Sequence, residues 1–400
     1  MTSGRLGEME EANWKVSRPE LPPQFSVETT RARSGVLHLV IAWAIAVTVI
    51  WIFAAIYGQA GRPERAVELP QSPVDVLSSW DGMHYRHLAE HGYSTEGEEI
   101  RRLNLFPLFP AISYLVGGSK QAAVAGILLN QLFLLGSMLL LTGLMRNGGT
   151  ARLREQPGFW LLISPFAFFF STMYTESLFL FLSLVMVLSA RRRCYGIAFI
   201  AGVLAGLTRP MAICLPLLLI PMVVAAVLHR EKSLRLLTVT AAPLIGICIY
   251  AGAVGVATGD PIGYLHIHSG WNNQWSIPFA AMWDAVRWYT LERLAVGSFE
   301  PLDIPAAAAS TALIIALLVS YGWRKPMVAY VPYLLGSLLL IHAQLPFRGT
   351  GRYELVLFPV FLLAAGSFLT KRWLFPIAVV VSIAEQIFLL IRFAQWRWVA

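Results

Sequence analysis

The sequence predicts an all-α protein that crosses a membrane several times. Hydrophobic residues make up 56% of the 400 residues, charged residues only 14%, and the mean hydropathy is +0.61, which is unlike a soluble domain. Apolar runs of about 20 residues, the length that spans a bilayer, recur along the chain. The basic residues form small clusters between these runs, so the net charge of +8 indicates membrane topology and no nucleic-acid partner.

The chain divides into a polar tail and one membrane domain. Residues 1–34 are polar and of mixed charge, and we expect a weakly ordered cytoplasmic tail rather than a signal peptide. Residues 35–400 form the predicted domain. Its first span, 35–57, contains no charge, and a polar external loop, 58–104, follows it.

The remaining apolar runs bring the predicted total to about eleven spans. Residues 105–118 are short and contain Pro107 and Pro110, which predicts a re-entrant or surface segment. The further predicted spans are 121–145, 158–170, 174–190, 195–208, 210–228, 236–257, 305–323, 327–343, 352–370 and 373–393.

The positive-inside rule orients these spans, because short cytoplasmic loops concentrate Lys and Arg. With the N-terminus in the cytoplasm, the clusters 191–193, 324–325 and 371–372 all fall inside. The loop 58–104 and the long loop 258–304 then lie outside. We therefore expect a multi-pass protein of the plasma (inner) membrane with an extracytoplasmic active site.

The first external loop carries the candidate catalytic residue. Residues 79–93 are rich in acids, histidines and aromatic residues, and Asp81 follows Trp80. A carboxylate at the mouth of an apolar bundle is partly desolvated, which suits it to accept a proton from a hydroxyl. A helix N-cap is the alternative role for this aspartate.

Three histidines in the same stretch have helical spacing. His84, His87 and His91 can share one face of a helix. A surface helix at the membrane interface accounts for this pattern, and a metal site is the alternative. The three cysteines, Cys194, Cys214 and Cys248, have no metal-ligand spacing and are predicted to be packing residues.

A second acid lies between aromatic runs. Glu176 is flanked by Tyr174 and Ser177. An ionisable group at this depth is costly to bury and indicates function, and a helix cap at the interface is the alternative. Tyr174 and Ser177 can converge with it.

Three arginines are candidates for binding an anion. Arg209 lies inside a mostly apolar run, and Arg348 and Arg352 fall on the outer face, against the positive-inside pattern. A guanidinium either reaches the interface or matches a phosphate in geometry and charge. A lipid-linked phosphate is the expected anion in a membrane.

The long external loop contains aromatic and amide side chains. Trp271 precedes Asn272 and Asn273. Stacking surfaces beside amides suit a sugar, whereas tryptophan also belongs to the interfacial belt of membrane proteins.

In several of these residues the chain resembles the GPI mannosyltransferase 2 (phosphatidylinositol-glycan class V) family and its bacterial relatives, in the GT-C class of membrane glycosyltransferases. The resemblance implies a GT-C-like bundle of helices. The similarity covers about the first half of the chain. It departs from the family at Ser164-Pro165, where Asn-Pro is usual, and at Pro210-Met211. The matching pieces are Trp80-Asp81, residues 88–93, residues 106–110, residues 174–179 and Arg209.

The resemblance implies an inverting mannosyltransferase with a functional acid in its first external loop. Its donor would be a polyprenyl-phosphate sugar and its acceptor a glycolipid, a glycan or a protein. No cofactor is required, and a divalent cation is the alternative. A lipid flippase or transporter, and a scaffold subunit without activity, are the rival functions.

On this hypothesis the candidate residues have three roles. Asp81 is the general base, and Arg209, Arg348 and Arg352 bind the donor phosphate. The sugar and acceptor pocket comprises Trp80, Tyr85, His91, Tyr93, Tyr174, Glu176, Ser177 and Trp271.

Overall fold

The computed structural model describes residues 23–60, 72–145, 152–230, 234–269, 274–290, 303–345, 349–397 and 399. These residues are mostly helical, which confirms the prediction of a helical, multi-pass membrane protein. Six of the described helices are long and apolar enough to cross a membrane, while Tyr195–Gly206 and Met327–His342 are apolar but shorter. The total of about eleven spans stays a prediction. The six are Ser34–Tyr57, Leu108–Leu144, Pro210–Leu228, Leu234–Thr258, Ile304–Tyr321 and Leu374–Ala394.

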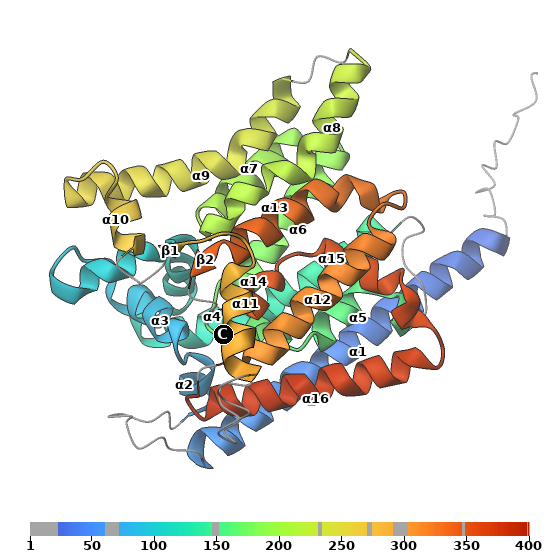
Figure 1. The fold of residues 1–400 in the computed structure, drawn as a ribbon, viewed down its shortest axis with the longest axis horizontal. Helices are drawn as coiled ribbons and strands as arrows, with labels where there is room; N and C mark the ends of the chain where they lie inside the picture. The colour runs from blue at the N-terminus through green and yellow to red at the C-terminus, as the bar shows by residue number, and fades with distance from the viewer. Residues whose placement is uncertain are drawn as a thin grey trace, which may run out of the picture.

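The first and last of these helices lie side by side (Figure 1). Helix α1 covers Pro23–Ala60 and α16 covers Leu374–Ala394. Because α1 begins at Pro23, its first turns belong to the segment predicted as a tail. Proline is favoured at the first position of a helix, where its missing N–H has no helical partner.

The described part of the loop predicted to be external, 58–104, folds into short helices α2 (Pro73–Leu77), α3 (Asp81–His91) and η1 (Gly97–Asn104). Ser72 and Asp75 form a capping box that starts α2. Trp80, with φ 59° and ψ −125°, occupies the N-cap of α3, and Asp81 is the first residue within that helix. The N-cap alternative for Asp81 is therefore wrong.

Helix α4 (Leu108–Leu144) contains a kink at Gly118. This glycine has φ 62° and ψ −175°, values that cost other residues far more than glycine. The kink falls between the predicted segments 105–118 and 121–145. Pro107 is the N-cap and Pro110 lies in the first turn, where proline is tolerated, so the prolines do not break the helix.

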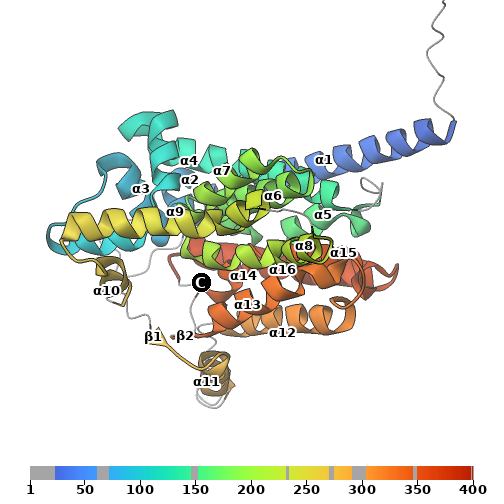
Figure 2. The same cartoon turned by 90° about the horizontal axis from the view of Figure 1, so that it is seen from above.

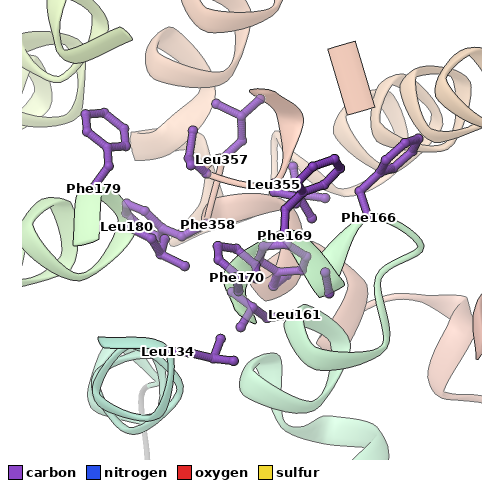
Figure 3. Close-up of a cluster of buried hydrophobic side chains, with 14 of the residues drawn as sticks. Leu134, Leu161, Phe166, Phe169, Phe170, Phe179, Leu180, Leu355, Leu357 and Phe358 are labelled. Carbon is purple, nitrogen blue, oxygen red and sulfur yellow. The ribbon is translucent and has the colours of Figure 1, made fainter. Parts of the chain in front are cut away.

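The centre of the protein is a cluster of buried aromatic side chains. It joins α5 (Pro157–Ile163), η3 (Ala167–Ser171) and α6 (Glu176–Arg191). Figure 3 shows Phe166, Phe169 and Phe170 in one cluster with side chains of residues 355–358. Packing between these two segments brings distant parts of the chain to the same place.

Two predicted spans are each divided into several short helices. Residues 158–170 hold only α5 and η3, and residues 352–370 hold α14 (Thr350–Glu354), α15 (Pro359–Ala365) and η7 (Phe368–Thr370). Pro165 and Pro359 interrupt the helical hydrogen bonds in these runs. The described residues of both runs are largely buried in protein, which keeps this non-helical backbone away from lipid.

Two further helices approach each other closely through glycines. A Cβ atom on Gly206 would lie 2.1 Å from the carbonyl oxygen of Pro243, and one on Gly246 would lie 2.1 Å from that of Val203. Small residues allow this kind of contact between membrane helices. The elements of this region are α7 (Tyr195–Gly206), η4 (Pro210–Cys214), α8 (Pro216–Leu228) and α9 (Leu234–Thr258).

Helices α12 and α13 belong to a second layer. Figure 2 shows them on the opposite side of the molecule from α1, α4 and α7. Strand β1, from the segment 258–304, pairs antiparallel with β2. The remaining elements are η2 (Leu153–Glu155), α10 (Gly263–Ser269), β1 (Gln274–Trp275), α11 (Ala280–Trp288), α12 (Asp303–Tyr321), η6 (Met327–Tyr330), α13 (Val331–His342) and β2 (Gln344–Leu345).

Candidate active site

Four ionisable residues from distant segments meet in one place. Arg352 Nη1 donates a hydrogen bond to Asp81 Oδ2 at 2.7 Å. Arg352 Nε lies 3.4 Å from Glu176 Oε1, and Arg209 Nη1 contacts the same Glu176 oxygen. We call Asp81, Arg352, Glu176 and Arg209 the ion-pair chain; it has two positive and two negative groups.

The ion-pair chain is buried at one end and accessible at the other. The Glu176 and Arg209 side chains are 1% and 6% exposed, whereas Asp81 is 25% exposed. Charges this deep in a protein persist only when they are paired. Of the two acids in the ion-pair chain, Asp81 is thus the one that a ligand can reach.

Several polar atoms of the ion-pair chain make no hydrogen bond within the described residues. They are Glu176 Oε2, Arg209 Nη1 and Arg352 Nε, all of which are buried. The contacts of Glu176 with both arginines are therefore ion pairs without hydrogen-bond geometry. Buried N–H groups without acceptors are costly, and an anionic ligand would satisfy them.

Aromatic rings surround the two guanidinium groups. The ring centroid of Tyr353 lies 5.2 Å from Cζ of Arg209 and 5.1 Å from Cζ of Arg352. The ring of Tyr174 lies 5.1 Å from Cζ of Arg352. These are cation–π distances. Sequence reasoning missed Tyr353, although it directly follows Arg352.

Tyr174 also fixes the start of α3. Its hydroxyl donates to the carbonyl oxygen of Ser79 at 3.0 Å. A Cβ atom on Gly82 would lie 3.1 Å from Tyr174 Cε2, so glycine allows the ring to approach the helix. The positive φ of Trp80 between these residues is strained for a non-glycine residue. The contacts of Tyr174 on both sides of Trp80 and Asp81 thereby fix this turn.

The turn that carries Tyr174 is itself anchored by α4. Asn130, fully buried, donates from Nδ2 to the carbonyl oxygens of Thr172 and Tyr174 at 2.6 and 2.7 Å. Arg209 precedes η4, and the carbonyl oxygen of nearby Leu207 accepts from the N–H of Leu108 at 3.1 Å. Helix α4 therefore positions the segments that carry Glu176 and Arg209.

The other predicted pocket residues occupy different places. Tyr85 is buried with its ring 6.4 Å from that of Tyr174, and the Trp80 ring lies 5.6 Å from that of Trp396. Ser177 Oγ donates to the carbonyl oxygen of Phe170 at 2.7 Å, so this hydroxyl has a structural partner.

Two more predicted residues, His91 and Tyr93, lie at and just beyond the end of α3, and two lie outside the described residues. His91 is exposed at the far end of α3, about 15 Å along the helix axis from Asp81. Tyr93 donates to the carbonyl oxygen of Leu105 at 2.9 Å. Trp271 and Arg348 belong to the parts of the chain that are not described.

The histidines of α3 join a polar network. His87 Nε2 lies 3.0 Å from Glu99 Oε2, and Arg102 Nε donates to His84 Nδ1 at 3.3 Å. Burial lowers the pKa of His84, and the charge of Arg102 lowers it further, while Asp81 raises it. Within the described residues, no three His, Cys, Asp or Glu side chains are grouped to hold a metal ion.

No protein-family model matches the chain, and neither does any curated protein. The family resemblance therefore depends on the sequence motifs alone.

Proposed function

We propose that the chain is a membrane glycosyltransferase. It would move a sugar, mannose by the family resemblance, from a polyprenyl-phosphate donor to a hydroxyl of an extracytoplasmic glycolipid, glycan or protein. The observation that carries the proposal is the ion-pair chain, in which an accessible carboxylate adjoins two buried guanidinium groups in a membrane protein.

The proposed reaction is a single inverting displacement. The acceptor oxygen attacks C1 of the sugar, and its proton passes to Asp81. The bond between C1 and the phosphate oxygen breaks, and polyprenyl phosphate leaves with the bonding electrons. Arg352 engages only Oδ2 of Asp81, so the other carboxylate oxygen can accept the proton.

The arginines would stabilise the leaving phosphate. Negative charge grows on that phosphate as the bond breaks, in a site with little water, where fixed cations act most strongly. Glu176 contacts both arginines. It would keep the two guanidinium groups together before the donor arrives.

A transfer assay tests the proposal. Purified protein in nanodiscs receives radiolabelled undecaprenyl-phosphate mannose and a crude membrane fraction as acceptor. We expect Asp81→Asn to lower the transfer rate by about 10²- to 10⁴-fold, the usual contribution of a general base. Asp75→Asn is the matched control, because Asp75, on α2, pairs with Arg86, on α3, and lies outside the ion-pair chain.

The results separate the rival functions. Undiminished transfer by Asp81→Asn would remove Asp81 as the base. Movement of labelled lipid across vesicles without any transfer would identify a flippase instead. Neither transfer nor translocation, with undecaprenyl phosphate failing to bind, would favour a scaffold subunit.

A further inference from the structure

Four aromatic rings form a wall beside the ion-pair chain. We call Tyr93, Phe106, Tyr250 and Tyr264 the aromatic wall. Tyr264, from α10, lies 5.6 Å from Phe106 and 6.2 Å from Tyr250, measured between ring centroids. Tyr250 lies 6.2 Å from Tyr93. The wall thus joins the first external loop to α9 and to the long external loop.

The tyrosine hydroxyl groups of the aromatic wall differ in their hydrogen-bond partners. The Tyr250 oxygen lies 2.9 Å and 2.8 Å from the carbonyl oxygens of Leu103 and Leu105, and Tyr93 donates to Leu105. The Tyr264 hydroxyl is enclosed but has no hydrogen-bond partner among the described residues. An enclosed hydroxyl without a partner is unfavourable in the free protein.

The aromatic wall adjoins the segment that carries Arg209, because Leu207, two residues earlier, packs against the cluster that contains Phe106 and Tyr250. Burial raises the pKa of Tyr264, and the neighbouring hydroxyls of Tyr250, Tyr85 and Tyr353 raise it further. Tyr353 packs on Arg209 and Arg352. The aromatic wall is therefore an extension of the candidate active site.

The wall has the chemistry of a carbohydrate subsite. The Tyr93 side is exposed and Tyr264 is half-buried, so ring surface is available for stacking. At its edge, His268 Nδ1 lies 2.9 Å from Asn104 Oδ1, and the His268 ring stacks 6.2 Å from Tyr264. Aromatic faces combined with a few fixed polar groups are typical of sites for polyols such as sugars.

We infer that the aromatic wall binds a sugar unit of the acceptor, and that the Tyr264 hydroxyl hydrogen-bonds to one of its hydroxyl groups. The assignment to the acceptor rests on the proposed glycosyltransferase function. Sugar binding as such depends only on the wall. Tyr264 would therefore determine acceptor specificity.

A matched pair of variants tests the inference. Tyr264→Phe and Tyr250→Phe each remove one hydroxyl from the wall and leave the ring. Thermal unfolding is measured without ligand in a detergent that contains no sugar. Binding of methyl α-D-mannopyranoside and methyl α-D-glucopyranoside is measured by saturation-transfer NMR at a temperature where both variants are folded.

One variant should mainly affect glycoside binding, and the other should mainly affect stability. Tyr264→Phe should keep or raise the unfolding temperature, because no internal hydrogen bond is lost, and should weaken binding of the preferred glycoside about 3- to 10-fold. Tyr250→Phe should lower the unfolding temperature, because the hydrogen bond from the Tyr250 hydroxyl to the backbone of residues 103–105 is lost, and should change binding less than Tyr264→Phe does.

Three results would overturn the inference. They are equal loss of stability in the two variants, unchanged glycoside binding by Tyr264→Phe, and no binding of either glycoside by the wild-type protein. Acceptor titrations in the transfer assay keep the two proposals apart. Glycoside binding that depends on Tyr264 without any transfer supports the subsite and refutes the transferase. Transfer whose acceptor KM is the same in Tyr264→Phe supports the transferase and refutes the subsite.

Discussion

Arg352 makes the widest range of contacts in the candidate active site. It donates to Asp81, which lies 271 positions earlier in the chain, and it contacts Glu176 and the rings of Tyr174 and Tyr353. A planar guanidinium can reach two acids at once, which an ammonium group cannot do with the same geometry. The residue therefore links Asp81 to the buried part of the site.

Replacing Arg352 should affect both folding and transfer. Arg352→Gln leaves Asp81 and Glu176 without this cation, and breaking a buried pair costs about 3 kcal/mol of folding free energy. We expect a lower unfolding temperature and a transfer rate reduced by at least about 10²-fold. Arg352→Lys should retain more stability than Arg352→Gln but little of the activity.

Thermal unfolding in detergent and the transfer assay measure the two effects. Arg191→Gln is the control, since Arg191 donates to Tyr330 at 2.7 Å and lies outside the ion-pair chain. Wild-type transfer by Arg352→Lys would show that charge alone suffices and that the fork geometry is unimportant.

The candidate residues differ in how far the sequence predicts their placement. Asp81, Glu176, Arg209 and Arg352 are noticeable in an apolar chain because burying a charge is costly. Ser177 and His91 have suitable chemistry, but a sequence does not show that Ser177 bonds to a backbone carbonyl or that His91 lies at the far end of α3. Tyr353 has no feature that separates it from an ordinary packing tyrosine.

At the scale of single elements, α14 is held from two sides. Arg352 extends from it to Asp81, and Glu354 accepts hydrogen bonds from Ser310 Oγ at 2.7 Å and Thr311 Oγ1 at 2.6 Å in α12. His342 Nε2 of α13 lies 3.5 Å from the same carboxylate. Since α14 has only five residues, these contacts fix the position from which Arg352 extends.

Glu354 should therefore act through Arg352. Glu354→Gln removes the negative charge and one acceptor, so α14 is held less firmly. We expect undecaprenyl phosphate to bind about 3- to 10-fold more weakly, which corresponds to the net contribution of one ordinary hydrogen bond. Native mass spectrometry of protein in nanodiscs measures this affinity without requiring transfer.

A double variant distinguishes positioning from a general loss of structure. In an Arg352→Gln background, Glu354→Gln should cause no additional loss of phosphate binding, because the group that it positions is absent. The same loss in both backgrounds would contradict the positioning role. Ser310→Ala removes one donor to Glu354 and should give a smaller effect than Glu354→Gln.

The sequence predicts the bounds of some helices closely and those of others poorly. The runs 195–208, 236–257 and 373–393 correspond closely to α7, α9 and α16. The runs 158–170 and 352–370 are equally apolar but fold as short helices. Hydrophobicity reports burial in lipid and burial in protein alike, so composition alone does not show which of these runs spans the membrane.

At the scale of the whole molecule, the basic clusters predict that one face is cytoplasmic. Cys194 is exposed and follows Arg191–Arg193. In a variant whose only cysteine is Cys194, made by Cys214→Ala and Cys248→Ala, a membrane-impermeant maleimide should label inverted vesicles and leave right-side-out vesicles unlabelled. Labelling of right-side-out vesicles would reverse the predicted topology.

The stability of the protein should depend on pH through its histidines. Burial lowers the pKa of His84, His87 and His268 from 6.5. Below pH 6.5 the unfolded chain therefore binds more protons than the folded protein, and folding stability falls as the pH falls. We expect the unfolding temperature to decrease between pH 7 and pH 5.

A histidine variant checks this explanation. His84→Gln should reduce the pH dependence while leaving the unfolding temperature at pH 7.5 close to that of the wild type. His38 is the control position, because it lies on α1 away from this network. An unfolding temperature that rises on acidification would contradict the assignment.

The meeting of the two layers is the part that sequence patterns predict least. Hydropathy and charge indicate which segments cross the membrane and in which direction. They do not indicate which helices become neighbours, and the ion-pair chain depends on α14 packing against η3 and α6. The convergence of the scattered charges is predicted on chemical grounds, because an isolated charge in a membrane is costly without a partner.

The ion-pair chain is electrically neutral before any ligand binds. A lipid phosphate that approaches Arg352 must compete with Asp81 and Glu176, which are tethered in the same place. Under the proposed function, Asp81 and Glu176 would therefore shorten the time for which the released lipid phosphate stays bound. A site that only had to bind phosphate tightly would lack these acids.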